Sequence, residues 1–147
     1  YHFTIVVRDA RATLSELEDK FCEAGGNDAL LCSHNDTIYL EYDREAKNAE
    51  QAINSALSDI RSLGFKDLIV EEQGYSTLAE MAERAGMTRQ ALSLYAKNKR
   101  GDGSFPRPMY GLGSKSTMYY WPEVATWLFK QGKLDKNHYE VAKTVVS

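Results

Sequence analysis

Hydrophobic residues in the first half of the chain change between a spacing of two and a spacing of three or four. Phe3, Ile5 and Val7 alternate with other residues, which predicts a strand whose apolar side chains share one face. Helical spacing follows twice, and glycine or turn-forming residues separate the segments. The predicted elements are a strand over residues 1–7, a helix from Thr13 to Gly25, strands over 29–33 and 37–42, a helix from Asn48 to Gly64, and a strand over 67–72.

This order of elements, β-α-β-β-α-β, predicts a ferredoxin-like domain, in which two helices cross one face of a four-stranded antiparallel sheet. Thr13 and Asn48 can each cap a helix, and a Glu or Gln follows three residues later, as in a capping box. In this phase Phe3 and Tyr42 face the helices. The open face of the sheet carries His2, Thr4, Tyr39 and Glu41.

The second half of the chain has a different pattern, with short helices and one hairpin. Residues 71–74 have the composition of a linker. The predicted elements are helices over 76–85 and 88–97, an extended segment over 105–108, strands over 109–110 and 118–121 around a turn at 111–116, a helix from Pro122 to about Lys130, and a helix over 136–146. In the last helix, Tyr139, Ala142 and Val145 have nothing obvious to cover, so this helix is a candidate dimer contact.

Composition and charge divide the chain in the same way. With 147 residues, 43% of them hydrophobic and 27% charged, the chain is typical of a soluble protein of one or two small domains. Residues 1–74 carry 15 Asp and Glu against 7 Lys and Arg, whereas residues 75–147 carry 6 against 11. We therefore expect an acidic domain over 1–72 and a basic domain over 75–147, of which the basic one suits a polyanion. No apolar run reaches the ~18 residues of a membrane helix and no secretory signal is recognisable, so we expect a cytoplasmic location.

The segment over residues 78–97 has the spacing of a helix-turn-helix. A small residue, Ala82, precedes Gly86 by four positions, where the chain is expected to turn. Leu92 and Tyr95 follow six and nine positions after the glycine and are the expected inner residues of the second helix. A plain helical hairpin with a solvated outer face is the alternative that this spacing leaves open.

The outer face of the second helix suits a DNA major groove. Thr88 is placed to cap this helix. Arginine can recognise guanine, glutamine can recognise adenine, and leucine can contact the methyl group of thymine. The residues expected on this face are Arg89, Gln90, Ser93, Leu94 and Lys97, with Arg89 and Gln90 the best candidates for reading bases.

Three further motifs follow in order. They are Phe105-Pro106-Arg107-Pro108, Trp121 at the end of the hairpin, and Glu123-Val124 followed by Trp127-Leu128. Together with the helix-turn-helix spacing, residues 76–128 resemble the winged helix-turn-helix of the MerR/excisionase superfamily, especially the short AlpA-type prophage regulators. The resemblance covers about a third of the chain. It implies that the second helix enters the major groove. Independently of the resemblance, we expect Phe105, Trp121 and Trp127 to lie in the core rather than to stack on bases.

The resemblance also implies a hairpin wing, with Lys115 near its tip, that contacts backbone phosphate or the minor groove. The family has an arginine before the tryptophan, where this chain has Tyr119-Tyr120. The segment over 97–104 is also longer and more basic than is usual in the family. We expect Lys99 and Arg100 to lie on a flexible stretch there. The candidate DNA-binding residues are Thr88, Arg89, Gln90, Ser93, Leu94, Lys97, Lys99, Arg100, Arg107 and Lys115.

Catalysis is not indicated by the sequence. The three histidines are dispersed, and no serine or cysteine lies in a nucleophile motif. Cys22 and Cys32 fit small buried hydrophobic positions. Arg84 is expected to be solvated or paired with Glu80. We therefore expect a protein without enzymatic activity, metal or cofactor.

The leading hypothesis is a bacterial or prophage regulator of transcription that binds double-stranded DNA sequence-specifically. The domain over 1–72 would mediate homodimerisation, with Val6 and Tyr39 on the open sheet as a candidate interface, or would bind a small ligand or protein. Its acidity argues against RNA binding through the sheet. One alternative is an excisionase-type or architectural factor that bends DNA. Another is an antitoxin or adaptor whose acidic domain blocks a partner protein.

Overall fold

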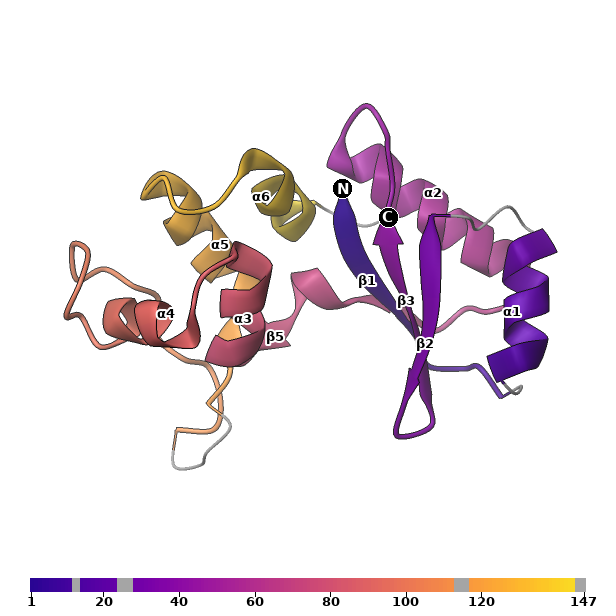
Figure 1. Cartoon of the computed structure of the whole chain (residues 1–147), viewed down its shortest axis with the longest axis horizontal. Helices are drawn as coiled ribbons and strands as arrows, with labels where there is room; N and C mark the ends of the chain where they lie inside the picture. Colours follow the sequence, from indigo (N-terminus) through magenta and orange to yellow (C-terminus); the bar gives the residue numbers. More distant parts are fainter. Residues whose placement is uncertain (12–13, 24–27, 113–116, 145–147) are drawn as a thin grey trace. The chain divides into compact units, whose positions relative to one another are not determined.

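The chain has an α+β fold and divides into two compact units. The computed structural model describes residues 1–11, 14–23, 28–112 and 117–144 (Figure 1). Residues 1–71 belong to the first unit and residues 72–143 to the second. None of the described helices is long and apolar enough to cross a membrane.

The first unit is a four-stranded antiparallel sheet with two helices. Its strands lie in the order β2-β3-β1-β4, and both helices lie on the same side of the sheet (Figure 1). The elements are β1 (His2–Val7), α1 (Leu14–Glu23), β2 (Ala29–His34), β3 (Thr37–Asp43), α2 (Ala49–Ser62) and β4 (Leu68–Val70). The order of these elements along the chain and the antiparallel sheet agree with the prediction from the sequence.

The core of the first unit lies between the sheet and the helices. Ile5 of β1, Leu40 of β3 and Ile53 of α2 are completely buried, as expected for residues in the inward phase of each element. The Asn48 side chain caps α2 by accepting a hydrogen bond from the Gln51 N–H at 2.8 Å, which confirms the predicted cap. The predicted cap of α1, at Thr13, lies outside the described residues.

Three of the four residues predicted as a linker, 72–74, belong to the second unit. The last strand of the first unit ends at Val70, so the predicted strand over 67–72 is too long. Residues Glu71–Gln73 form a 3₁₀ turn (η1), and the Gly74 carbonyl accepts a hydrogen bond from the Trp121 N–H at 3.0 Å. Glu72 is only 9% exposed. A polar composition predicted a solvated connection here, but contacts with residues distant in sequence hold the segment in place.

The second unit contains four helices and a small sheet among its described residues. The elements are β5 (Tyr75–Ser76), α3 (Leu78–Ala85), α4 (Arg89–Ala96), β6 (Tyr119–Tyr120), α5 (Trp121–Lys130) and α6 (Lys136–Lys143). The first helix was predicted to begin at Ser76, and this is wrong by two residues. Thr77 caps α3 in a reciprocal capping box with Glu80, so Ser76 is left in extended backbone and joins β5.

The predicted wing is also built differently. Only one bridge, Tyr110↔Met118, joins its two sides within the described residues. The main partner of β6 is β5, which pairs Tyr75 with Tyr120 and Ser76 with Tyr119. A two-residue strand has no recognisable period, so the sequence did not reveal that a segment before α3 completes the wing.

The last helix packs on its own unit, which contradicts the expectation that it is free for a dimer contact. The Tyr139 ring stacks on the Phe129 ring of α5 at a centroid distance of 4.2 Å. Ala142 is 3% exposed and belongs to the core that contains Trp121 and Leu92. Val145 lies outside the described residues.

Candidate nucleic-acid interface

The turn between α3 and α4 is fixed by local backbone geometry. Gly86 ends α3 with a left-handed φ of 67°, and the Met87 N–H donates to the Ala82 carbonyl at 2.9 Å. Thr88 then caps α4, since its Oγ1 accepts a hydrogen bond from the Ala91 N–H at 3.1 Å. The positive φ predicted at Gly86 and the helix cap predicted at Thr88 are confirmed.

The inner side of α4 is the one predicted from the spacing. Leu92 is completely buried and Tyr95 is 6% exposed, and both pack in one core with Ala82 of α3. Because Leu92 and Tyr95 are buried, the opposite side of α4 is exposed to solvent.

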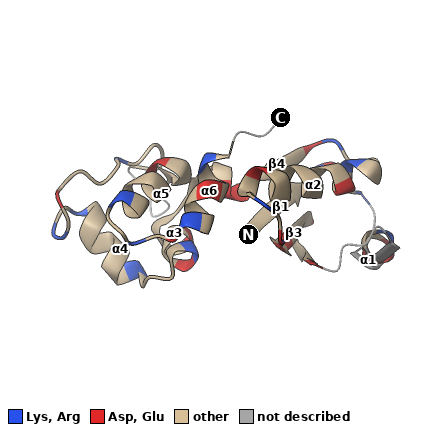
Figure 2. Ribbon diagram, turned by 90° about the horizontal axis from the view of Figure 1, so that it is seen from above, with Lys and Arg blue, Asp and Glu red and all other residues tan. Residues whose placement is uncertain are grey.

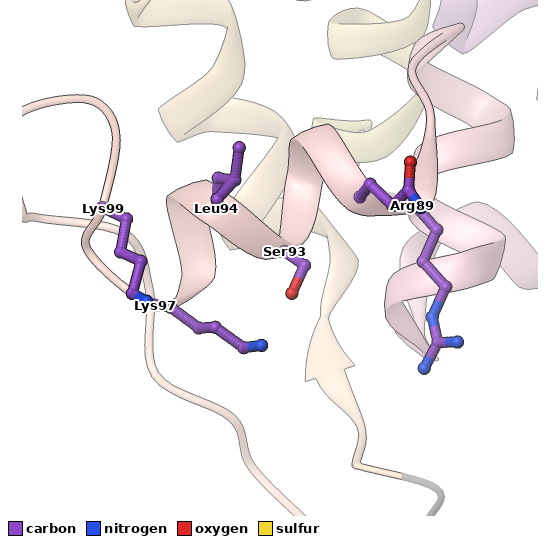
Figure 3. Close-up of a pocket in the computed structure, with 6 residues that line it drawn as sticks. Arg89, Ser93, Leu94, Lys97 and Lys99 are labelled. Carbon is purple, nitrogen blue, oxygen red and sulfur yellow. The ribbon is translucent and has the colours of Figure 1, made fainter.

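The outer side of α4 forms an open groove of about 460 Å³ together with Lys97 and Lys99, which follow the end of the helix. In Figure 3 the side chains of Arg89, Ser93 and Lys97 point to one side of the helix axis, and Leu94 points to the other. The groove is lined by Arg89, Gln90, Ser93, Leu94, Lys97 and Lys99, all of which were predicted as DNA-binding residues.

The two best candidates for reading bases, Arg89 and Gln90, lie at different positions around the axis of α4. Successive residues of an α-helix are rotated by roughly 100°. Because Leu92 and Tyr95 mark the inner side, Gln90 and Lys97 lie at the centre of the outer side. Arg89 lies at its margin. The sequence ranked Arg89 and Gln90 together, whereas the geometry places Gln90 at the centre of the outer side and Arg89 at its edge.

The backbone directly after α4 is hydrogen-bonded to the last turn of that helix. The Lys97 N–H donates to the Ser93 carbonyl and the Lys99 N–H donates to the Leu94 carbonyl, both at 2.9 Å. Asn98 takes a left-handed φ of 59° that turns the chain between them. Lys99 is thereby held beside the last turn of the helix.

Remote contacts hold the next part of this loop. Gly101 lies so close to two rings that a Cβ atom would meet Tyr95 Cδ1 at 3.1 Å and Trp127 Cη2 at 3.2 Å. The Trp127 Nε1–H donates to Ser104 Oγ at 2.9 Å, and the Ser104 N–H donates to Asp102 Oδ1 at 3.0 Å. We refer to residues 97–104 as the clamp loop, because these contacts hold it against α4 and α5.

The carboxylate of the clamp loop is engaged by neutral donors. The Ser104 hydroxyl and N–H donate to Asp102, and Gln131 Nε2 donates to its second oxygen at 3.2 Å. These bonds, led by that from the Ser104 side chain, lower the pKa of Asp102. The Arg100 guanidinium of the same loop lies over the Tyr95 ring, 6.0 Å from its centroid.

Arg84 does not belong to the basic surface, and the expectation that it is solvated or paired with Glu80 is wrong. Its guanidinium donates to Ser76 Oγ, lies 3.9 Å from the Glu72 carboxylate and stands over the Trp121 ring at 5.6 Å. Glu80 instead completes the capping box of α3. The Arg84 charge is therefore satisfied inside the second unit.

Arg107 and Lys115 are the two candidate residues that follow the clamp loop in the sequence. Arg107 is exposed on the extended segment that follows Phe105, and Phe105 is 7% exposed and packs against Trp127. Lys115 lies outside the described residues. Figure 2 shows the basic segments of α4 and the clamp loop on the second unit.

The first unit offers a different surface. The predicted open face of its sheet is confirmed, since Phe3 and Tyr42 are buried while His2 and Glu41 are exposed. Cys32 is half-buried on this face rather than fully buried. The side chain of Cys22 lies outside the described residues. Among the residues that the structure describes, no group of His, Cys, Asp and Glu could hold a metal ion.

Sequence reasoning missed the contacts that fix the clamp loop. The available signal was a tryptophan, Trp127, whose indole N–H needs an acceptor when the ring is buried. No family model, curated protein or solved structure matches the chain. Function is therefore inferred from the geometry of this chain.

Proposed function

We propose that residues 72–143 form a winged helix-turn-helix domain that binds double-stranded DNA, with α4 in the major groove. The protein acts as a sequence-specific regulator of transcription, in a bacterium or prophage. The first unit is a ferredoxin-like domain that serves dimerisation or sensing of a ligand or protein.

The observation that carries this proposal is the outer side of α4 with its clamp loop. Arg89, Lys97 and Lys99 line one groove, and no acidic side chain lines it. An α-helix fits the major groove, and lysine and arginine on its flanks neutralise phosphates. The fixed clamp loop supports the proposal, because cations that are already oriented lose less conformational entropy on binding.

Gln90 is the residue proposed to read a base. Its side chain is exposed at the centre of the outer side of α4, where an amide can form two hydrogen bonds with the edge of an adenine. Leu94, half-buried beside it, offers an apolar contact to a thymine methyl group. Arg89, at the margin, is proposed to contact a phosphate or an outer base.

The proposal is tested with the full chain on DNA selected from a random duplex pool. Binding is measured by fluorescence anisotropy over a range of salt concentrations. The double variant Lys97→Ala/Lys99→Ala is compared with Lys133→Ala/Lys136→Ala, which removes two exposed lysines elsewhere in the same unit. The first variant is expected to weaken binding and to reduce the salt slope by about 0.9 for each lost phosphate contact. The second is expected to leave both unchanged.

Three outcomes separate the competing functions. Selection of one sequence from the pool supports a sequence-specific regulator. Binding with strong bending but without a preferred promoter site favours the excisionase or architectural alternative. Absence of DNA binding by the full chain refutes the proposal and favours an adaptor whose acidic unit binds a protein.

A further inference from the structure

The clamp loop is exposed along its whole length, yet hydrogen bonds tie both of its ends to helices. Every residue from Lys97 to Ser104 is exposed. Exposed connecting segments bury little apolar surface and usually belong to the less stable parts of a structure. The bonds that hold this loop therefore add little to the hydrophobic core. Their main effect is on where the loop places the side chains that it presents to solvent.

The first end of the clamp loop is tied to α4 through the backbone. The Asn98 N–H donates to the Tyr95 carbonyl at 3.1 Å, and the Lys99 N–H donates to the Leu94 carbonyl at 2.9 Å. Lys99 lines the groove on the outer side of α4. The guanidinium of the next residue, Arg100, lies over the Tyr95 ring. Lys99 is therefore the cation that the loop, beyond the end of α4, contributes to the groove.

The second end of the clamp loop is tied to α5 through side chains. Trp127 and Gln131 are four residues apart and so lie on the same side of the α5 axis. Trp127 Nε1–H donates to Ser104 Oγ at 2.9 Å, and Gln131 Nε2 donates to Asp102 at 3.2 Å. The Ser104 hydroxyl also donates to Asp102. One serine oxygen thus joins α5 to the loop that carries Lys99.

We infer that Ser104 is a positioning residue for the proposed DNA-binding site. It holds the clamp loop on α5, with Gln131 as a second tie, and so keeps Lys99 beside the groove before DNA is present. A cation that is already in place loses less conformational entropy when it meets a phosphate. In this role Ser104 itself contacts no DNA. The inference rests on the proposed function, because it concerns the affinity of that same groove.

The role also specifies which property of binding Ser104 controls. The lysine ammonium is a point charge that neutralises a phosphate, and every duplex offers phosphates. Base edges are read by other side chains, for which Gln90 is proposed. Loss of the Ser104 hydroxyl should accordingly weaken binding to all duplexes by a similar factor and leave the selected sequence unchanged.

The test compares three substitutions in the full chain. Ser104→Ala removes the hydroxyl that accepts from Trp127 and donates to Asp102, and Ser104→Thr keeps a hydroxyl at the same place. The matched control is Ser62→Ala, which removes an exposed hydroxyl that donates to the Asp59 carbonyl in the first unit. Ser104→Ala is expected to raise Kd roughly fivefold to tenfold on a selected and on an unrelated duplex. The other two variants should bind as the wild type does.

A double-mutant cycle shows whether Ser104 acts through the cations of its loop. The same Ser104→Ala change is made in a Lys99→Ala/Arg100→Ala chain, where the position of the loop no longer matters for phosphate contacts. No further loss of affinity is expected in that background. An equal loss in both backgrounds would overturn the inference, because Ser104 would then act by direct contact or by destabilising the whole unit.

The order of the loop is measured without DNA by ¹⁵N relaxation. The N–H bonds of Asp102 and Gly103 are expected to have order parameters near ~0.85 in the wild type and below ~0.6 in Ser104→Ala, with α4 and α5 unchanged. Low values in the wild type would overturn the inference, since the loop would not be held. High values in Ser104→Ala would do the same, since other contacts would then hold it.

The binding data distinguish failure of this inference from failure of the proposed function. A wild-type chain that binds no duplex refutes the proposed function and the role of Ser104 with it. A wild-type chain that binds DNA no more tightly than Ser104→Ala refutes the positioning role alone and leaves the proposed function standing.

Discussion

Comparing two alanine substitutions in the clamp loop, at Gly101 and at Gly103, separates the destabilisation caused by backbone strain from that caused by steric overlap. Gly101 and Gly103 both have left-handed φ angles, 83° and 79°. An L-residue pays about 1–2 kcal/mol in this region, so both substitutions carry this cost. Only at Gly101 does a new Cβ also meet rings, Tyr95 at 3.1 Å and Trp127 at 3.2 Å, whereas nothing lies within 4 Å at Gly103.

The contact at Gly101 is expected to add a further ~1–3 kcal/mol, as overpacking against buried side chains usually does. Gly101→Ala should therefore lower the free energy of unfolding clearly more than Gly103→Ala. In a domain of 60–100 residues each kcal/mol lowers Tm by about 4–8 °C. The difference between the two variants measures how tightly the clamp loop is packed on Tyr95 and Trp127.

Tryptophan fluorescence during urea denaturation is a suitable assay. The chain has 2 tryptophans, Trp121 and Trp127, and both lie in the second unit, so the signal reports the unfolding of that unit. DNA affinity measured on the same proteins should fall more for Gly101→Ala, because the loop that carries Lys99 is displaced. Equal losses of stability for the two variants, within ~0.5 kcal/mol, would refute the packing of the loop on the rings.

Three further predictions concern other parts of the chain. Thr77→Ala removes the hydroxyl that accepts a hydrogen bond from the Glu80 N–H, while the backbone N–H of residue 77 can still donate to the Glu80 carboxylate. The change should cost ~1 kcal/mol in urea denaturation followed by tryptophan fluorescence; no change would mean that α3 does not depend on this cap. The hydrogen bond from Arg44 to Asp28, at 2.6 Å, lowers the pKa of Asp28 below its ordinary value of 3.8. The stability that this ionisation contributes is complete above about pH 4 and is lost as the pH falls through the lowered pKa. Asp28→Asn should accordingly flatten the acid limb of a far-ultraviolet circular dichroism titration, and an unchanged limb would contradict the assignment. Gln90→Glu should shift the preference at one base pair from adenine to cytosine in a random-pool selection, because a carboxylate accepts from cytosine N4. An unaltered selected sequence would show that Gln90 does not read a base.

Local signals in the sequence were sufficient for most of the helices and strands. Gly86 fixes the turn through its positive φ, and Thr88 fixes the start of α4 through its side-chain hydroxyl. Both effects depend only on residues close in sequence. The inward face of β1 could likewise be predicted from a local pattern, the alternation of Phe3, Ile5 and Val7. The outer residues of α4 followed once its inner residues were known.

Contacts between distant segments were not predictable in this way. Tyr75 and Ser76 form a strand only because β6 lies beside them, and two residues have no period of their own. The composition of residues 101–104 is typical of a flexible loop, and only the distant Trp127 gives it a fixed conformation. The α6 helix was expected to be free because its partner, Phe129 on α5, could not be identified without knowing how the two helices meet.

Residues 72–76 pack with the second unit, and this determines where the chain can be cut to separate the second unit from the first. A fragment that starts at the cap of α3 would lack Glu72 and Ser76, the partners of the Arg84 guanidinium, and would leave one edge of β6 without its strand. Such a fragment would fail to fold for a reason unrelated to the proposed DNA-binding surface. Transplantation of the proposed helix-turn-helix into a chimeric protein should therefore place the junction at residue 71, five residues before the segment that begins at Ser76.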